Sequence, residues 1–210
     1  MLTAIRNNSG VLALFACITT GLIAATNYLT EDKIEVQNEV QLLSVINQVV
    51  PTSLYDNDLS HSCILIEDPD LGTAQAMPAY IARQGDKPSA IAIETIAPDG
   101  YSGDIKLIVG MKFDGTITGT RVLEHKETPG LGDKIEMRVS DWITSFNGKR
   151  VTADNDTAWH VRKDGGEFDQ FTGATITPRA VVKAVKKAAL YVTQHQDALV
   201  AQPLTCGGQA

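Results

Sequence analysis

Three hydroxyl side chains lie close together in residues 169–178, which read DQFTGATITP. They belong to Thr172, Thr175 and Thr177. Thr177 followed by Pro178 predicts the N-cap and first position of a helix, because a threonine hydroxyl accepts a free backbone N–H and proline lacks one. Such a helix start carries unpaired N–H groups and partial positive charge, which suit a phosphate. An ordinary helix cap after a tight turn is the alternative.

The residues around these hydroxyls leave space for a phosphate to reach them and predict a long helix after them. Gly173 and Ala174 leave little side chain to obstruct a bound phosphate. Beyond them, apolar residues recur at helical spacing as far as Gln196, with four basic residues mainly on the other side. The apolar set is Val181, Val182, Val185, Ala188, Ala189 and Val192, and the basic set is Arg179, Lys183, Lys186 and Lys187.

A second segment with the character of a binding loop is 124–132, EHKETPGLG. Pro129 fixes one backbone dihedral, while Gly130 and Gly132 permit positive φ, so a shaped loop is expected at a sheet edge. Loops of this kind on rigid strands commonly carry sites. A solvated connection with incidental charges is the alternative.

The elements that would hold these two segments are mainly strands. Apolar runs at 90–97 and 105–113, followed by the hairpin signal Asp114-Gly115 and a returning run at 116–123, predict an antiparallel meander of at least three strands. Short strands at 63–66 and 79–82 are expected in a loop-rich region, and a short helix at 134–146.

The N-terminal region has the composition of a membrane anchor. Residues 7–30 contain no charge over 24 positions, enough to cross a hydrocarbon core of about 30 Å. A cleaved signal peptide is less favoured, because its apolar core is usually only ~7–15 residues long and no small-residue cleavage motif follows. Arg6 before the segment and Glu31 and Asp32 after it predict a cytoplasmic N-terminus. A helical pattern then continues until Pro51.

Charge and cysteine content exclude several classes of protein. All 25 acidic residues but only 17 of 18 basic ones lie beyond residue 30, so the part after the anchor is acidic and nucleic acid binding is not expected. Cys17, Cys63 and Cys206 have no C-x-x-C spacing, so no metal site is predicted. Whether Cys63 and Cys206 pair stays open.

Four features in this order carry a family resemblance: residues 100–105 (GYSGDI), the hairpin at 114–115, residues 127–132 (ETPGLG) and residues 169–175 (DQFTGAT). The chain resembles the FMN-binding domain family, and more narrowly the G subunits of Rnf (also Rsx) ion-translocating electron transport complexes. The related C subunit of the sodium-translocating NADH:quinone reductase, which is usually longer, is the nearest alternative.

The resemblance implies a cofactor and its attachment. In this family a flavin transferase splits FAD and leaves FMN joined by a phosphodiester to a threonine in a D-x-x-[S/T]-G-A-[S/T] motif. The implied acceptor is Thr175, and Asp169 belongs to the motif that the transferase reads. Thr172 stands where serine is more common, so Thr172 and Thr177 remain formal competitors. The implied cofactor-binding residues are Thr172, Gly173, Ala174, Glu127, Thr128, Gly130 and Leu131, with no catalytic side chain and no metal.

The expected protein is therefore of the α+β class, with a single transmembrane helix and an extracytoplasmic FMN-binding domain built on an antiparallel sheet with flanking helices. The expected divisions are 1–9 cytoplasmic, 10–29 anchor, 30–88 juxtamembrane helix and loops, 89–200 FMN-binding domain and 201–210 frayed tail. Such a protein would carry electrons in the bacterial inner membrane, with its flavin domain in the periplasm and other complex subunits as partners. A structural docking role without flavin is the alternative. Contacts of His125, Trp142 or Trp159 with the flavin stay open.

Overall fold

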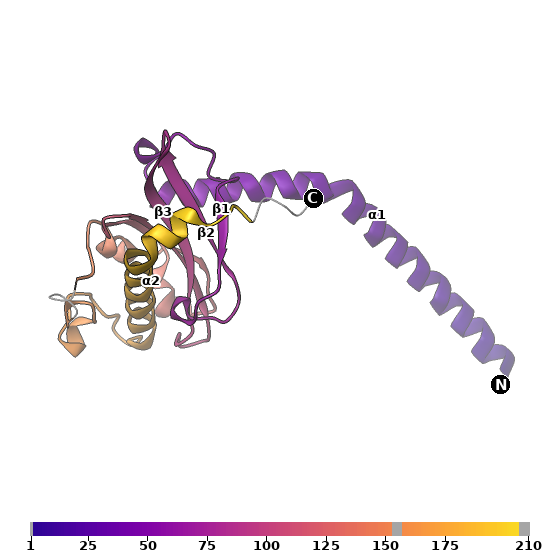
Figure 1. The fold of residues 1–210 in the computed structure, drawn as a ribbon. Coiled ribbons are helices and arrows are strands. Elements are labelled where there is room, and N and C mark those ends of the chain that lie inside the picture. Colours follow the sequence, from indigo (N-terminus) through magenta and orange to yellow (C-terminus); the bar gives the residue numbers. More distant parts are fainter. Residues whose placement is uncertain (1, 153–156, 206–210) are drawn as a thin grey trace. The chain divides into compact units, whose positions relative to one another are not determined.

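The computed structural model of the chain describes residues 2–152 and 157–205. They fall into two compact units that divide between residues 42 and 43. The helices and strands (Figure 1) are α1 (Leu2–Val49), β1 (Cys63–Ile66), β2 (Met77–Gln84), β3 (Lys87–Ala97), β4 (Ile105–Lys112), β5 (Ile117–Glu124) and α2 (Ile176–Ala201). Short 3-10 segments among the described residues include η1 (Thr52–Leu54), η2 (Pro69–Leu71), η3 (Gly132–Ile135), η4 (Trp142–Phe146) and η6 (Arg162–Asp164).

The first unit is the N-terminal part of α1, as far as residue 42. Large apolar side chains on it are exposed, namely Leu12, Leu14, Phe15, Ile18, Leu22, Ile23 and Val40. Within the described residues, no helix is both long enough and apolar enough to cross a membrane. The span expected at residues 10–29 is thus not confirmed by the structure.

The second unit is built on a five-stranded antiparallel sheet in the order β1-β2-β3-β4-β5. The expected three-strand meander is confirmed as β3 to β5, and the hairpin at Asp114-Gly115 is confirmed as well. Asp114 accepts a hydrogen bond from the Thr116 N–H at 2.8 Å, and Gly115 adopts φ +89°. β2 is longer than the expected strand at 79–82, because its first residues, Met77 and Pro78, pair with β1 and its last, Arg83 and Gln84, pair with β3.

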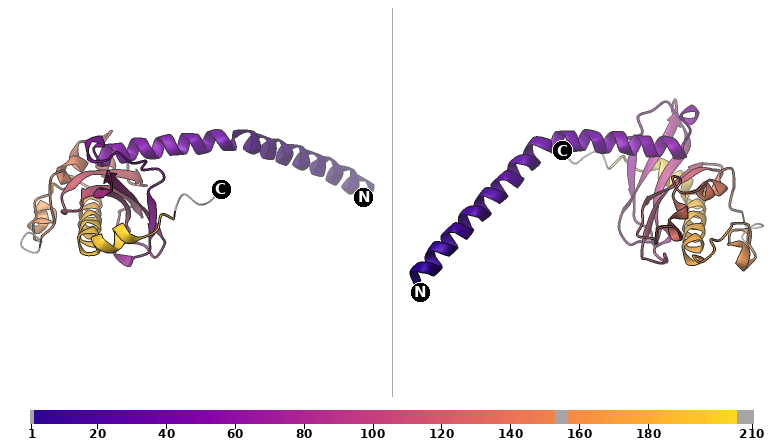
Figure 2. Two further views of the ribbon diagram at one scale, coloured as in Figure 1. Left: turned by 45° about the horizontal axis from the view of Figure 1, so that its top comes forward. Right: turned by 180° about the vertical axis from the view of Figure 1, so that it is seen from behind.

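Helix α2 covers one face of the sheet, and residues 43–49 at the end of α1 cover the other (Figures 1 and 2). The α2 face holds the main core, in which Val181, Val185 and Val192 pack with strand residues such as Ile93 and Val109. Burial of these apolar side chains is the main stabilising term, at roughly 25 cal/mol per Å² removed from water. It also fixes where α2 begins relative to the strand ends.

The end of α1 approaches the sheet at two glycines on neighbouring strands. Gly110 and Gly119 are paired across β4 and β5. A Cβ at Gly110 would lie 2.2 Å from the Val49 carbonyl oxygen, and one at Gly119 would lie 2.7 Å from the Val49 Cα. The Thr118 hydroxyl donates to the same carbonyl at 2.5 Å, which satisfies an unpaired group at the helix end.

Two expectations about local structure were wrong. The helix expected at 134–146 is instead η3 and η4 separated by a turn, because the Ser140 hydroxyl donates to the Lys134 carbonyl and accepts from the Trp142 N–H, competing with helical bonding. Of the tail expected to fray at 203–210, the described part, residues 203–205, is tied to the sheet, since the Thr205 N–H donates to the Cys63 carbonyl at 2.9 Å. Cys63 is disulfide-bonded, and Cys206 lies outside the described residues.

Gly110→Ala should lower the free energy of unfolding by about 1–3 kcal/mol, the usual cost of overpacking, because the added methyl displaces the end of α1. The measurement is denaturant unfolding of the purified full chain. Gly21→Ala is the control, since a Cβ there meets nothing within 4 Å. Equal stability of the two variants would contradict the proposed close approach.

Candidate functional site

A cavity of about 370 Å³ lies where three chain segments meet. The segment after β3 contributes Tyr101, the loop after β5 contributes residues 127–128 and 131–132, and the start of α2 contributes residues 173–177. Its full lining is Tyr101, Glu127, Thr128, Leu131, Gly132, Gly173, Ala174, Thr175, Ile176 and Thr177. The two segments singled out from sequence are thus brought together, although about 40 residues of chain separate them.

The carboxylate of Glu127 joins all three walls of the cavity. Its side chain is only 5% exposed. One carboxylate oxygen accepts the Ser102 backbone N–H at 2.9 Å, and the other accepts the hydroxyl of Thr177, which is fully buried. A buried carboxylate is costly unless hydrogen-bonded, and here each oxygen has a partner from a different segment.

Gly132 makes room for this arrangement. A Cβ there would lie 2.6 Å from a Glu127 carboxylate oxygen and 2.9 Å from the Thr177 hydroxyl. The loop is closed by the Thr128 carbonyl, which accepts the N–H groups of Leu131 and Gly132 at 3.1 Å each. Gly130 takes φ +77°, as the expected shaped loop requires, but it does not line the cavity.

His125 supports the same loop from behind. Its Nδ1 accepts the Glu127 backbone N–H at 3.0 Å, so the ring proton lies on Nε2, which donates to Glu136. The pKa of Glu136 is lowered to about 2, first by the hydrogen bond from Arg138 and then by that from His125, and these outweigh its burial. His125 is therefore a neighbour of the cavity and does not line it.

The start of α2 differs from the sequence prediction by two residues. The helix begins at Ile176 with Thr175 as N-cap, whereas Thr177 had been expected to cap it. Thr177 lies inside the first turn because its hydroxyl bonds Glu127. Thr175 is half-buried, lines the cavity, and makes no capping hydrogen bond with its side chain. The helix runs past the expected end to Ala201, with a kink at His195.

The turn before α2 is compact. The Ala174 N–H donates to the Phe171 carbonyl at 3.2 Å, and Gly173 takes φ +81° with its Cβ position 3.5 Å from Leu131. Of the residues expected to bind the cofactor here, Gly173 and Ala174 line the cavity, whereas Thr172 is exposed and does not. Asp169 also lies outside the lining, and its exposed carboxylate pairs with Arg162 at 2.8 Å.

Tyr101, Ser102 and Thr177 are the site residues that the sequence did not assign to these roles. Tyr101 and Ser102 belong to the motif at 100–105, whose place beside the other two motifs depends on the sheet. For Thr177 a signal existed, since it is a polar residue on the helix side that otherwise carries valines and alanines. Trp142 and Trp159, left open from sequence, belong to the core cluster and do not line the cavity.

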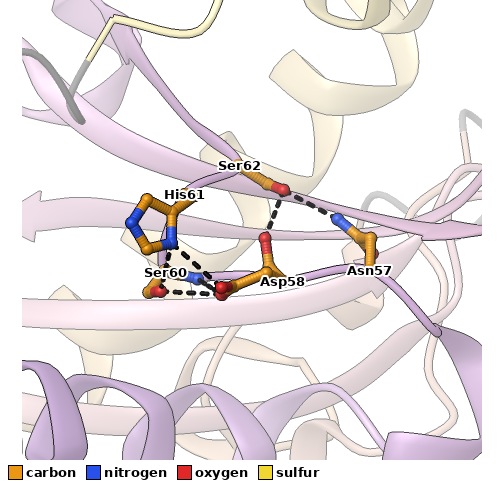
Figure 3. A network of polar contacts seen from close by, with 5 residues as sticks. All are labelled: Asn57, Asp58, Ser60, His61 and Ser62. Atoms are coloured by element: carbon orange, nitrogen blue, oxygen red, sulfur yellow. Dashed lines mark hydrogen bonds and ion pairs between the residues drawn. The ribbon is translucent and has the colours of Figure 1, made fainter.

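A second polar cluster precedes β1 (Figure 3) and superficially resembles a catalytic triad. Asp58, Ser60 and His61 are hydrogen-bonded to one another, but the carboxylate and the hydroxyl both contact the same His61 nitrogen, Nδ1. The imidazole therefore cannot pass a proton between them. Asn57 and Ser62 extend the network to the backbone of Ile81 and Asp58, so the cluster orders the turn.

The cavity suits a flavin nucleotide. Tyr101, Leu131 and Ile176 offer apolar surface to a planar ring, and the α2 N-terminus offers N–H groups to a phosphate. Among its lining residues in the described part of the chain none is basic, so the helix end is the only positive feature of the walls. This fold and cavity define an FMN-binding domain, and residues 100–190 match the family model of that description.

The relatives define the family more narrowly. Residues 1–49 match the family model "RnfG N-terminal region". The chain is 67% identical over 209 residues to the G subunit of the ion-translocating oxidoreductase complex of Vibrio atlanticus, with both chains fully covered. It is 56% identical over 200 residues to the Shewanella oneidensis protein of the same name, covering 95% of this chain and 94% of the relative. The chain belongs to the family of ion-translocating oxidoreductase complex G subunits, as the motifs predicted.

Glu127→Ala should lower the free energy of unfolding by about 2–4 kcal/mol, because the Ser102 N–H and the Thr177 hydroxyl both lose a buried partner. Glu127→Gln has a side chain of similar shape that keeps a hydrogen-bond acceptor, so its loss of unfolding free energy should be less than half that of Glu127→Ala. Denaturant unfolding measures both. Glu167→Ala, which removes an exposed carboxylate paired with Lys149, is the control and should change little. A loss no larger than that of the control would refute the proposed tie.

Arg138→Gln should lower stability at neutral pH and match the wild type near pH 2. Because the folded pKa of Glu136 is depressed to about 2, its ionisation stabilises the fold fully above the ordinary carboxyl pKa of about 4.3, and this contribution is lost as pH falls toward 2. Thermal unfolding at a series of pH values from 7 to 2 measures the difference in stability between the wild type and Arg138→Gln. Arg162→Gln is the control, and a pH-independent gap for Arg138→Gln would contradict the role of Glu136.

Proposed function

We propose that this chain carries electrons through FMN bound covalently to Thr175, as a subunit of a membrane complex that couples electron transfer to ion translocation. The observation that carries the proposal is that Thr175 lines the cavity at the N-terminus of α2 while its side chain makes no capping hydrogen bond. The flavin would supply the electron-carrying chemistry, and the protein would bind it, orient it and limit its contact with water.

The rival hydroxyls are less suited to be the acceptor. Thr172 is exposed and outside the cavity lining, and Thr177 is fully buried with its hydroxyl engaged by Glu127. Attachment forms a phosphorus–oxygen bond at Thr175 while the pyrophosphate bond of FAD breaks, AMP leaves and the hydroxyl proton is released. A flavin transferase would perform this step, with Asp169 as part of the motif it reads.

The remaining residues of the cavity would hold the cofactor. Leu131 and Thr128 would contact the isoalloxazine ring, together with Tyr101 and Ile176. The backbone N–H groups at the start of α2 would stabilise the phosphodiester. Because the described lining contains no basic side chain, the phosphate would be held weakly without a covalent bond, which gives the attachment a physical reason.

Membrane attachment through residues 10–29 is part of this proposal, with a cytoplasmic N-terminus and a periplasmic flavin domain in a bacterial inner membrane. Its support is the 24-residue stretch without charge. The hydroxyls of Thr19 and Thr26 donate to the carbonyls of Phe15 and Leu22 at 2.9 Å and 2.8 Å, as polar groups in an apolar medium must. Extraction of the full chain from membranes by alkaline carbonate would refute this anchoring.

Thr175→Ala should abolish covalent flavin, because no other residue is proposed to accept it, whereas Thr175→Ser should retain it. Mass spectrometry of the peptide containing residue 175, together with flavin fluorescence in a denaturing gel, measures the adduct. Thr52→Ala, which removes an exposed hydroxyl outside the motif, is the control and should stay flavinylated. Wild-type protein that lacks the adduct in cells with an active transferase would favour a structural docking role instead.

A further inference from the structure

Five aromatic side chains form one cluster beneath the turn that precedes α2. They are Trp142, Phe146, Trp159, Phe168 and Phe171, and each is at most 9% exposed. Trp142 meets Phe171 edge to face, with ring centroids 5.2 Å apart, and meets Phe146 in the same way at 5.5 Å. Trp159 packs instead on Phe146 and Phe168.

Trp142 differs from Trp159 in that it holds the turn at two points. Its indole N–H donates to the Asp169 backbone carbonyl at 2.8 Å, and its ring packs on Phe171, two residues further along. The other contact of Asp169 is the ion pair between its exposed carboxylate and the exposed Arg162, which contributes little in water. The indole hydrogen bond and the buried ring of Phe171 thus anchor this end of the turn.

The opposite end of the turn is anchored by the bond between Thr177 and Glu127. Between the two anchors lie exposed residues, including Thr172 and Gly173, and then Thr175. Between these ends Phe171 is buried, but Thr172 and Gly173 are exposed, so the backbone is held in place while Thr175 stays accessible. Freeing one end would let residues 169–175 sample other conformations.

We propose that Trp142 is a positioning residue for the modification of Thr175: its indole N–H fixes the Asp169 carbonyl so that the turn presents the Thr175 hydroxyl for phosphoryl transfer from FAD. This inference rests on the proposed function. Trp142 is not among the described residues that line the cavity, and it would act through the turn.

The test uses the full chain produced without a flavin transferase and then treated with the transferase and FAD. Trp142→Phe removes the N–H and keeps an aromatic ring, and it should lower the maximal rate of adduct formation about tenfold, as expected for one lost ordering hydrogen bond. Trp159→Phe is the matched control in the same cluster and should react at the wild-type rate. A time course by mass spectrometry gives both rates.

A second variant separates the hydrogen bond from packing. Benzothienylalanine at position 142 keeps the bicyclic shape but has no N–H, so it should react as slowly as Trp142→Phe while its unfolding temperature stays near that of the wild type. Hydrogen exchange in the unmodified protein should quicken over residues 169–175 in both Trp142 variants and stay unchanged in Trp159→Phe.

The proposal would be overturned by a wild-type rate of adduct formation in Trp142→Phe or in the benzothienyl variant. It would also be overturned if the rate fell in both Phe variants in proportion to the fall in their unfolding temperatures. If the wild-type chain takes up no flavin from a transferase that modifies one of its relatives, the proposed function fails. The exchange measurement still decides in that case whether Trp142 orders the turn.

Discussion

A single buried carboxylate holds together the three segments that form the cavity in which the flavin is proposed to bind. Glu127 lies on the loop after β5, yet its two oxygens bind the Ser102 backbone and the Thr177 hydroxyl, so three segments remote in sequence share one anchor. A buried carboxylate is stable only when its oxygens are hydrogen-bonded, so the Ser102 backbone and the Thr177 hydroxyl must lie within hydrogen-bonding distance of it. Gly132 belongs to the same constraint, because any larger residue would displace the carboxylate.

The same anchor gives two nearby threonines different roles. The hydroxyl of Thr177 donates to Glu127 from inside the first turn of α2, whereas Thr175 lines the cavity and its side chain makes no capping hydrogen bond. A helix N-terminus favours an anionic phosphate, and its N–H groups are the positive feature of the described walls. The weak charge complementarity of the cavity and the proposed covalent bond are therefore consistent: the bond would retain an anionic cofactor that the walls alone bind poorly.

The sheet connects this site to the rest of the chain. Its α2 face supplies the main core, and its other face receives the end of α1 at Gly110 and Gly119. Movement of the end of α1 would thus act directly on β4 and β5, and β5 leads into the loop that carries Glu127.

The sequence by itself determined the family, the three-strand meander, the hairpin at Asp114-Gly115 and the motifs that meet at the cavity, because turn residues, apolar periodicity and ordered motifs are local properties. It misplaced the start of α2, because a threonine before a proline is compatible with more than one position at a helix start. It also predicted one helix where η3 and η4 lie, because the same apolar run is compatible with one helix or with two short helical turns. Only the tertiary structure decided the start of α2, the two 3-10 segments and the role of Glu127. The hydrogen-bond partners of this buried carboxylate lie far away in sequence, and burial determines which threonine hydroxyl is hydrogen-bonded inside the protein.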